Sequence, residues 1–511
     1  LVGIGQGGLG LGERDYYLSD DAQVKAVREA YAKYLKQILV LAGNDEATAQ
    51  KKADATMRIE TRLAKASKST VEMRDVQSNY HKMTYNALVK DFPGIDWGNY
   101  FLIQGFPAFS HVDVGQIEPI HEVEKVLAEE SLDDLKAYAE AHAVSSSSAY
   151  LDDNFRKADF ELSRVMSGVQ QDRPRWKRAT SLVSGVLGEA IGKLYVEKYF
   201  PATSKEMMLK LVKNLQIALS QRIDESTWMS AATKAQAKDK LDNFIVKIGY
   251  PDKWRDYSGL NVDESLSLLE NMGNISEFMS KDYIARKVNK PVDKSEWQMT
   301  PQTVNAYYNP TTNEICFPAA ILQPPFFDPN VDEAVNYGGI GGVIGHEMSH
   351  GFDDQGSQFD KYGNQKDWWT AADKKNFEAR TKVLVDYFSN IEALPGKKIN
   401  GKLTLGENIG DNGGLNISLR ALENVLKENP EARKTIDGFT PEQRFFLSWA
   451  NVWAGNARPE FVDRQIKTDP HSPAEARVNA ALPMIDTWYK AFNVKKGDKL
   501  FVDKKKRAHI W

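Results

Sequence analysis

A glycine-crowded segment that also carries two closely spaced histidines constrains the fold of this chain more than any other feature. The segment reads GGIGGVIGHEMSH and covers residues 338–350. Each glycine inside a helix costs about 1 kcal/mol relative to alanine, so the segment is poorly helical by itself. Glycines also let another backbone come close, because they have no side chain. We therefore expect a helix that is held in place by tight tertiary packing or by a metal.

The two histidines of this segment are spaced so that both rings project from one face of the helix. His346 and His350 are four residues apart in a chain that has only 8 histidines. Tight packing explains the glycines but not this pair. Zinc binds imidazole nitrogen, and the pattern His-Glu-x-x-His is typical of zinc hydrolases, in which the glutamate acts as the base. We therefore predict that both histidines bind zinc and that Glu347 is the general base.

A second glycine-containing segment supplies candidates for a third ligand. A catalytic zinc usually has three protein ligands and one open position. The stretch TLGENIGDNGGL places Glu407 and Asp411 four residues apart, so both carboxylates project from one helical face. One can bind the metal while the other accepts the second ring N–H of a ligand histidine, which fixes the orientation of the ring. We assign Glu407 to the metal and Asp411 to the histidine.

The overall composition is that of a large globular protein. The 511 residues, of which 42% are hydrophobic and 27% charged, predict two or three domains with a large core. A formal net charge of −4 argues against nucleic acid as a partner. Cys316 is the only cysteine, which excludes an intrachain disulfide. No apolar run approaches the roughly 20 residues that span a bilayer, so we expect no transmembrane segment.

The character of the sequence changes near residue 295. Residues 18 to about 290 read as successive helices, with apolar residues at helical spacing. The stretch VNAYYNPTTNEICFPAAIL, residues 304–322, is rich in β-branched and aromatic residues and predicts a short strand pair. We therefore expect a mainly α fold with a smaller β component, of the α+β class. The expected domains are a helical domain, 1–290, and a catalytic domain, 291–511.

The chain resembles the neprilysin family of zinc peptidases, which includes the endothelin-converting enzymes and bacterial oligopeptidases of the PepO type. The likeness runs from GLGLGERDYYL near the start to the final Trp511. It is densest in VNAYYNP, FPAAILQPPFF, NYGGIGGVIGHEMSHGFDDQG, LGENIGDNGGL and KTDPHSPAEARVNA. The resemblance implies a thermolysin-like zinc catalytic domain that faces a helical cap domain around an internal chamber for oligopeptides.

The resemblance also implies a role for each matching residue. His346, His350 and Glu407 match the ligands of one Zn²⁺, Glu347 the general base, and Asp411 the carboxylate that orients a ligand histidine. His471, in DPHSPAEAR, matches the histidine that stabilises the transition state. Substrate-binding residues also have counterparts: Arg477 for a substrate carbonyl, Asn305 and Ala306 for the peptide backbone, and Ile321, Phe326, Val343, Val452 and Trp453 for the hydrophobic S1′ pocket.

These matches predict a zinc-dependent endopeptidase that cleaves oligopeptides on the amino side of large hydrophobic residues. Glu347 is expected to take a proton from a water molecule that the zinc polarises, and this water is the nucleophile. Family members extend upstream of GLGLGERDYYL, so the upstream segment is an expected partner of this chain. The ending AHIW has Ala508 where mammalian members carry a cysteine. This difference indicates a bacterial member. We also expect a location outside the cytoplasm, with any export signal upstream of Leu1.

Two other functions are compatible with parts of the sequence. A protein that binds peptides without cleaving them would keep the general architecture. The joint presence of metal ligands, a base and His471 argues against it. An unrelated metal-dependent hydrolase would use the carboxylate pair for a different ion. Zinc's preference for nitrogen ligands, and the absence of further clustered carboxylates in the sequence, argue against calcium or magnesium.

Overall fold

The computed structural model describes residues 1–511, which divide into two compact units. Unit 1 consists of Leu1–Arg175, Asp256–Asp293 and Arg458–Phe461, and unit 2 of Trp176–Arg255, Lys294–Ala457 and Val462–Trp511. The sequence predicted one boundary near residue 290, but the two units are each made of several segments. Residues 176–255 pack with the C-terminal part of the chain in unit 2. Each unit is mainly helical with a small sheet, which confirms the predicted α+β class.

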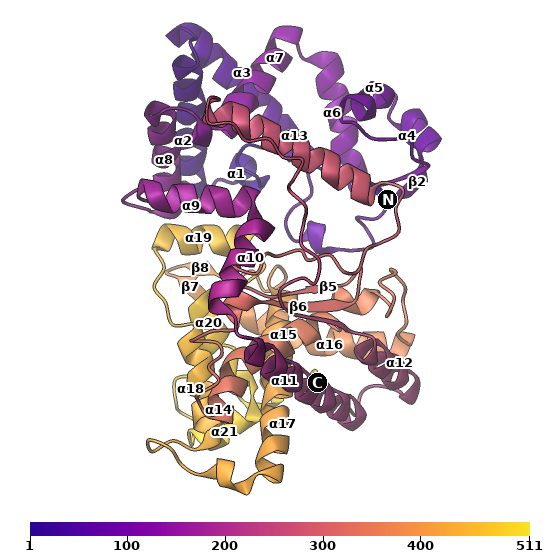
Figure 1. Ribbon diagram of the computed structural model, residues 1–511, viewed down its shortest axis with the longest axis vertical. Helices are drawn as coiled ribbons and strands as arrows, with labels where there is room; N and C mark the ends of the chain where they lie inside the picture. Colours follow the sequence, from indigo (N-terminus) through magenta and orange to yellow (C-terminus); the bar gives the residue numbers. More distant parts are fainter. The chain divides into compact units, whose positions relative to one another are not determined.

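Unit 1 contains several long helices (Figure 1), and two of them begin at side-chain caps. The carboxylate of Asp21 accepts hydrogen bonds from the first turn of α2 (Ala22–Leu41), and Asp45 does the same for α3 (Glu46–Ala66). Such caps satisfy backbone N–H groups that a helix start leaves unpaired. The other helices of this unit are α1 (Asp15–Leu18), α4 (Tyr85–Asp91), α5 (Trp97–Ile103), α6 (Ile117–Glu129), α7 (Leu132–Ser147), α8 (Asp153–Ser167) and α13 (Leu268–Lys287).

A small sheet completes unit 1. Strand β3 (His111–Val114) lies between β1 (Val2–Ile4), which runs parallel to it, and β2 (Lys82–Thr84), which runs antiparallel. Val112 and Val114 on the central strand are fully buried, and they form a core together with residues of α4 and α5. The sheet therefore carries a hydrophobic core that is separate from the one beneath α2 and α3.

The sheet of unit 2 explains why residues 176–255 belong there. Strand β4 (Ile245–Gly249) lies parallel to β6 (Glu314–Pro318), and β5 (Tyr307–Asn309) lies antiparallel on the other side of β6. Ile315 on the central strand pairs with Val246 on one side and Tyr308 on the other. The hairpin of β5 and β6 confirms the predicted strand pair. Because β5 is an edge strand, its outer backbone groups can pair with another extended chain.

Helices make up most of the remainder of unit 2 (Figure 1). They are α10 (Gly188–Tyr199), α11 (Ala202–Glu225), α12 (Ala231–Asp242), α14 (Glu333–Asn336), α15 (Gly342–His350), α16 (Ala371–Phe388), α17 (Leu405–Glu428), α18 (Pro441–Val452), α20 (Ala474–Asn479) and α21 (Asp486–Ala491). A short pair of strands, β7 (Glu392–Leu394) and β8 (Lys397–Lys398), follows α16. Helices α9 (Arg175–Val186) and α19 (Pro459–Thr468) each contain residues of both units. None of the helices combines the length and the apolar character that crossing a membrane requires.

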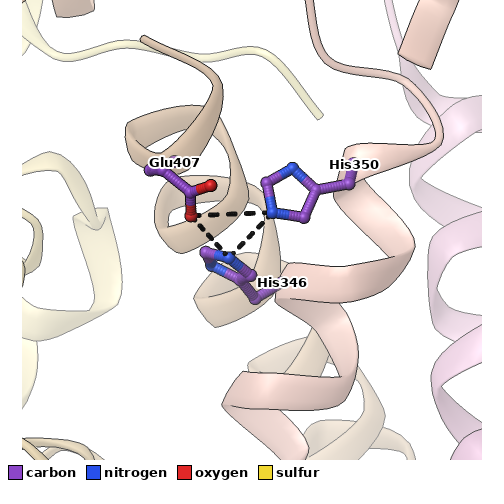
Figure 2. Close-up of side chains that lie close together, drawn as sticks. All are labelled: His346, His350 and Glu407. Atoms are coloured by element: carbon purple, nitrogen blue, oxygen red, sulfur yellow. Dashed lines mark hydrogen bonds and ion pairs between the residues drawn. The ribbon is translucent and has the colours of Figure 1, made fainter. Parts of the chain in front are cut away.

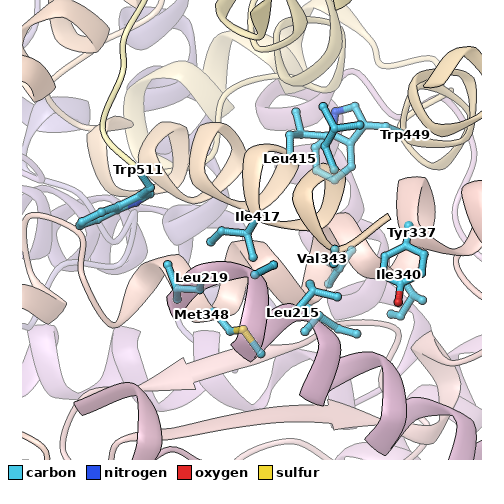
Figure 3. Packing of buried hydrophobic residues seen from close by; sticks show 14 of the residues in the cluster. Leu215, Leu219, Tyr337, Ile340, Val343, Met348, Leu415, Ile417, Trp449 and Trp511 are labelled. Carbon is cyan, nitrogen blue, oxygen red and sulfur yellow. The ribbon is translucent and has the colours of Figure 1, made fainter. Parts of the chain in front are cut away.

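The glycine-rich helix α15 packs against α17 backbone to backbone. A Cβ atom on Gly345 would lie 2.6 Å from the carbonyl oxygen of Gly414, and one on Gly414 would lie 2.5 Å from the backbone nitrogen of His346. Optimal carbon contacts are about 3.5–4.0 Å, so neither position accepts a side chain without a shift. Figure 3 shows the surrounding core, in which Leu215 and Leu219 from α11 lie near Val343 and Met348 of α15. The expected tight packing is therefore present.

Candidate metal centre

Three side chains from α15 and α17 converge on one point. His346 and His350 project from α15 and Glu407 from α17, and Figure 2 shows all three pointing toward one another. Their potential ligand atoms all lie within 4.8 Å of one another. Nε2 of His346 is 3.0 Å from Nε2 of His350 and 3.1 Å from Oε2 of Glu407. Nε2 of His350 is 3.6 Å from the same oxygen.

This spacing fits a tetrahedral zinc ion. Bonds of about 2.0–2.1 Å at tetrahedral angles separate neighbouring ligand atoms by roughly 3.4 Å. Two imidazole nitrogens and one carboxylate oxygen are also the donor set found in catalytic zinc sites. The close approach of two ring nitrogens to one carboxylate therefore agrees with a metal site of three protein ligands and one open position.

Each of the two candidate ligand histidines also contacts a carboxylate through its other ring nitrogen. Nδ1 of His346 lies 2.9 Å from Oδ1 of Asp411, which was expected to contact one of the two histidines. Nδ1 of His350 lies 2.7 Å from Oδ2 of Asp353. Such contacts fix the tautomer that presents Nε2 to the metal. Sequence reasoning missed Asp353, although its position three residues after His350 was a usable signal.

Arg477 is tied to Asp411. Its Nε donates to Oδ2 of Asp411 at 2.9 Å and its Nη2 to Oδ1 at 2.6 Å. Burial would raise the pKa of Asp411, but Arg477 and His346 lower it overall. The guanidinium lies 3.8 Å from the centroid of the Trp453 ring. Arg477 is thus engaged by Asp411, a contact that the substrate role implied by the resemblance did not predict.

The candidate base Glu347 lies beside the metal ligands in a buried position. Burial raises its pKa, although His346 and His350 act in the opposite direction. For Glu407 burial also acts to raise the pKa, but the neighbouring His350, His346 and His471 hold it well below the usual range. One carboxylate is therefore suited to gain and lose a proton, and the other to remain ionised.

His471 reaches the centre from the loop between α19 and α20. Its Nε2 lies 3.1 Å from Oε2 of Glu407, and its Nδ1 lies 2.8 Å from Oδ1 of Asp469. Burial lowers the pKa of His471, but Asp469 and Glu407 together raise it to about 9. The two carboxylates therefore favour the protonated form of the ring. Asp469 was not predicted, although it stands only two residues before His471.

The predicted substrate residues lie around the same core. Asn305 and Ala306 directly precede the edge strand β5, and Oδ1 of Asn305 accepts a hydrogen bond from the Ala306 N–H at 2.9 Å. The five residues predicted to form the S1′ pocket all belong to one hydrophobic cluster or pack against it: Ile321, Phe326, Val343, Val452 and Trp453. The ring of Trp449 occupies the space next to Gly342, because a Cβ there would lie 2.7 Å from it.

Comparison with known proteins places this arrangement in a family. Models of peptidase family M13 match residues 1–251 and 305–508. A crystal structure of the Mycobacterium tuberculosis zinc metalloprotease Zmp1 in complex with an inhibitor is 41% identical, with a TM-score of 0.94 over 100% of this chain and 78% of that chain. This chain belongs to peptidase family M13.

Three further proteins are similar to nearly the whole of this chain. The structure of PepO from Lactobacillus rhamnosis is 28% identical, with a TM-score of 0.91 over 100% of this chain and 79% of that chain. Human endothelin-converting enzyme 1 is 35% identical over 94% of this chain and 64% of its own length. Neprilysin-11 of Caenorhabditis elegans is 35% identical over 93% of this chain and 58% of its own length. The chain thus spans roughly three fifths of these two curated relatives. Membership in this family of zinc peptidases, together with the three-ligand cluster, makes one zinc ion the cofactor.

Proposed function

We propose that this chain is a zinc-dependent endopeptidase that cleaves oligopeptides on the amino side of large hydrophobic residues. The observation that carries the proposal is the convergence of His346, His350 and Glu407 beside the buried Glu347. Membership in family M13 supports hydrolysis of peptide bonds as the reaction. Binding of the upstream segment and a location outside the cytoplasm stay predictions.

The side chains divide the chemistry among them. When bound, zinc supplies a Lewis acid that polarises water and the scissile carbonyl. Glu347 removes a proton from the attacking water and passes it to the leaving amine, a transfer worth about 10²–10⁴-fold in rate. His471 carries a positive charge next to Glu407 and stabilises the negative charge that develops on the carbonyl oxygen. Asp411 and Asp353 keep the two histidine rings aimed at the metal.

The peptide is proposed to bind as an additional strand. The chain next to the edge strand β5, at Asn305 and Ala306, offers backbone and amide groups to an extended peptide. The apolar residues around Val343 on α15 and Trp453 after α18 would receive the side chain that follows the cleaved bond. A large hydrophobic side chain is the one such surroundings favour.

A peptide-cleavage assay tests this proposal. Quenched fluorescent peptides that differ only in the residue after the cut, for example Phe, Leu, Gly and Asp, are incubated with the zinc-loaded chain. We expect Phe and Leu peptides to be cleaved before that residue, as product masses show. A chelator should stop the reaction and added zinc should restore it. Binding of the peptides without cleavage, or cleavage that survives removal of zinc, would contradict the proposal.

A further inference from the structure

A buried lysine outside the metal centre holds the segment that follows α15. Lys240, near the end of α12, is 2% exposed. Its Nζ donates to the carbonyl oxygens of Gly351 and Gly356, each at 2.7 Å, and of Phe359 at 2.8 Å. An ammonium group has three N–H donors, so these three carbonyl groups use its full capacity. All three belong to one short stretch of chain.

The same stretch carries the carboxylate that orients His350. Oδ1 of Asp353 accepts backbone N–H groups of Gln355 at 2.9 Å and Gly356 at 2.6 Å, while its Oδ2 contacts Nδ1 of His350. A Cβ on Gly356 would lie 1.8 Å from the carbonyl oxygen of His350. The turn from Gly351 to Phe359 therefore folds back tightly onto the end of the metal-binding helix.

The position of Lys240 is costly for the fold. Burial lowers its pKa to about 7, against the opposing effect of Asp353 and Asp360. All three hydrogen bonds of its Nζ go to backbone carbonyl groups and none to a carboxylate. The rings of Tyr308, Phe352 and Trp368 also lie near the charge. A methionine would fill a similar volume without that cost. A buried cation in this place is therefore better explained by what it positions than by what it adds to stability.

We infer that Lys240 is a positioning residue for the zinc site, because it fixes the Gly351–Phe359 turn and through Asp353 the orientation of the His350 ring. This inference rests on the proposed function, since it concerns the same metal. The hydrogen bonds of Lys240 go to the turn and not to the candidate metal ligands or substrate residues. Its effect must therefore appear in zinc affinity as well as in peptide cleavage.

Zinc affinity in a double-mutant cycle tests the inference. The zinc dissociation constants of the wild type, Lys240→Met, Asp353→Asn and the double variant are measured by competition with a chelating indicator at pH 6.5. Loss of a group that orients a ligand typically weakens metal binding about 10–100-fold. We expect the zinc dissociation constant of Lys240→Met to be about tenfold higher than that of the wild type. The double variant should bind zinc no more weakly than Asp353→Asn alone, because both residues act through the same contact. The absorption bands of bound Co²⁺ should change in the same way in both single variants.

Lys247→Met is the matched control. Lys247 is another buried lysine of unit 2, 7% exposed, but its Nζ donates to Glu314 and to the carbonyl of Glu296 instead of the turn. This variant should keep the zinc affinity of the wild type. If Lys240→Met does not fold, as circular dichroism shows, Lys240→Gln replaces it with the same expected loss. A neutral amide donates two N–H groups at most and brings an acceptor oxygen toward the carbonyl groups.

The outcomes separate this inference from the proposed function. The positioning role alone would be overturned if the Lys240 variant bound zinc within twofold of the wild-type affinity. It would also be overturned if the double variant lost the product of the two single losses in zinc affinity. A wild-type chain that binds no zinc would overturn the proposed function, and this inference with it.

Discussion

Glu347 and Glu407 are carboxylates beside the same two histidines, yet their surroundings shift their pKa values in opposite directions. Burial dominates for Glu347 and raises its pKa, whereas three neighbouring histidines hold the pKa of Glu407 low. These opposite shifts support the proposed roles, in which Glu347 carries the proton and Glu407 stays ionised and binds the metal. Two identical carboxyl groups thus differ in their tendency to bind a proton, because their surroundings differ.

Substitution of the two glutamates should separate catalysis from metal binding. Glu347→Gln is expected to keep one zinc per chain but to lower kcat by about 10²–10⁴-fold, because the amide cannot accept the proton. Glu407→Ala should lose the zinc, because a ligand is removed. Elemental analysis and peptide cleavage of both variants measure the two effects. A Glu347→Gln enzyme of near wild-type rate would show that another group is the base.

Lys240 makes a pH-dependent contribution to stability. Its pKa of about 7 in the folded chain lies below the unfolded value of about 10.4, so between these values the unfolded chain binds more protons. Its contribution to stability is therefore fully present above pH 10.4 and is lost as the pH falls toward 7. As the pH rises through this window, the free energy of unfolding of the wild type should increase relative to that of Lys240→Met by up to about 1.4 kcal/mol per pH unit. Urea unfolding of both proteins at several pH values measures this difference, and parallel curves would contradict it.

At the scale of elements, the zinc site depends on how closely two glycine-bearing helices approach. Gly345→Ala in α15 would place a methyl group against the backbone of Gly414 in α17. Overpacking of this kind typically costs about 1–3 kcal/mol, and it should also move Glu407 away from the two histidines and weaken zinc binding. Gly185→Ala in α9 is the matched control, because a Cβ there meets no atom within 4 Å. Chemical denaturation and zinc titration of both variants test this, and equal stability of the two would exclude the proposed contact.

The sequence predicted these two helices and the side-chain pair that each one carries, because helical spacing places His346 beside His350 and Glu407 beside Asp411. It did not predict the turn of π-helix at Tyr337–Gly341, which Ser418 supports through a 2.6 Å hydrogen bond to the carbonyl of Tyr337. It also missed Lys240, since its partners lie more than 100 residues away in the chain. Contacts between distant segments follow from tertiary packing, which local patterns do not encode.

At the scale of the whole molecule, the complete zinc site lies in unit 2. The pairing of β4 with β6 draws residues 176–255 into this unit. That pairing is long-range, so the change in sequence character near residue 295 did not reveal it. Unit 1 has hydrophobic cores of its own around α2, α3 and the β1–β3–β2 sheet. The metal should therefore stabilise one unit selectively.

Hydrogen exchange measured by mass spectrometry tests this selectivity. Removal of zinc should speed amide exchange in α15 and α17, because ligand binding stabilises only the structure that binds it. Exchange in α2 and α3 should stay unchanged, which makes these helices an internal control. Equal acceleration in both units would show that the metal acts on the entire chain.

The most direct measurement is anomalous scattering from crystals of the zinc-loaded chain at the zinc absorption edge. We expect one strong peak within about 2.0–2.2 Å of Nε2 of His346, Nε2 of His350 and a carboxylate oxygen of Glu407. A peak bound by other side chains would contradict this metal site. So would a chain that cleaves peptides while these three residues point apart around an empty space.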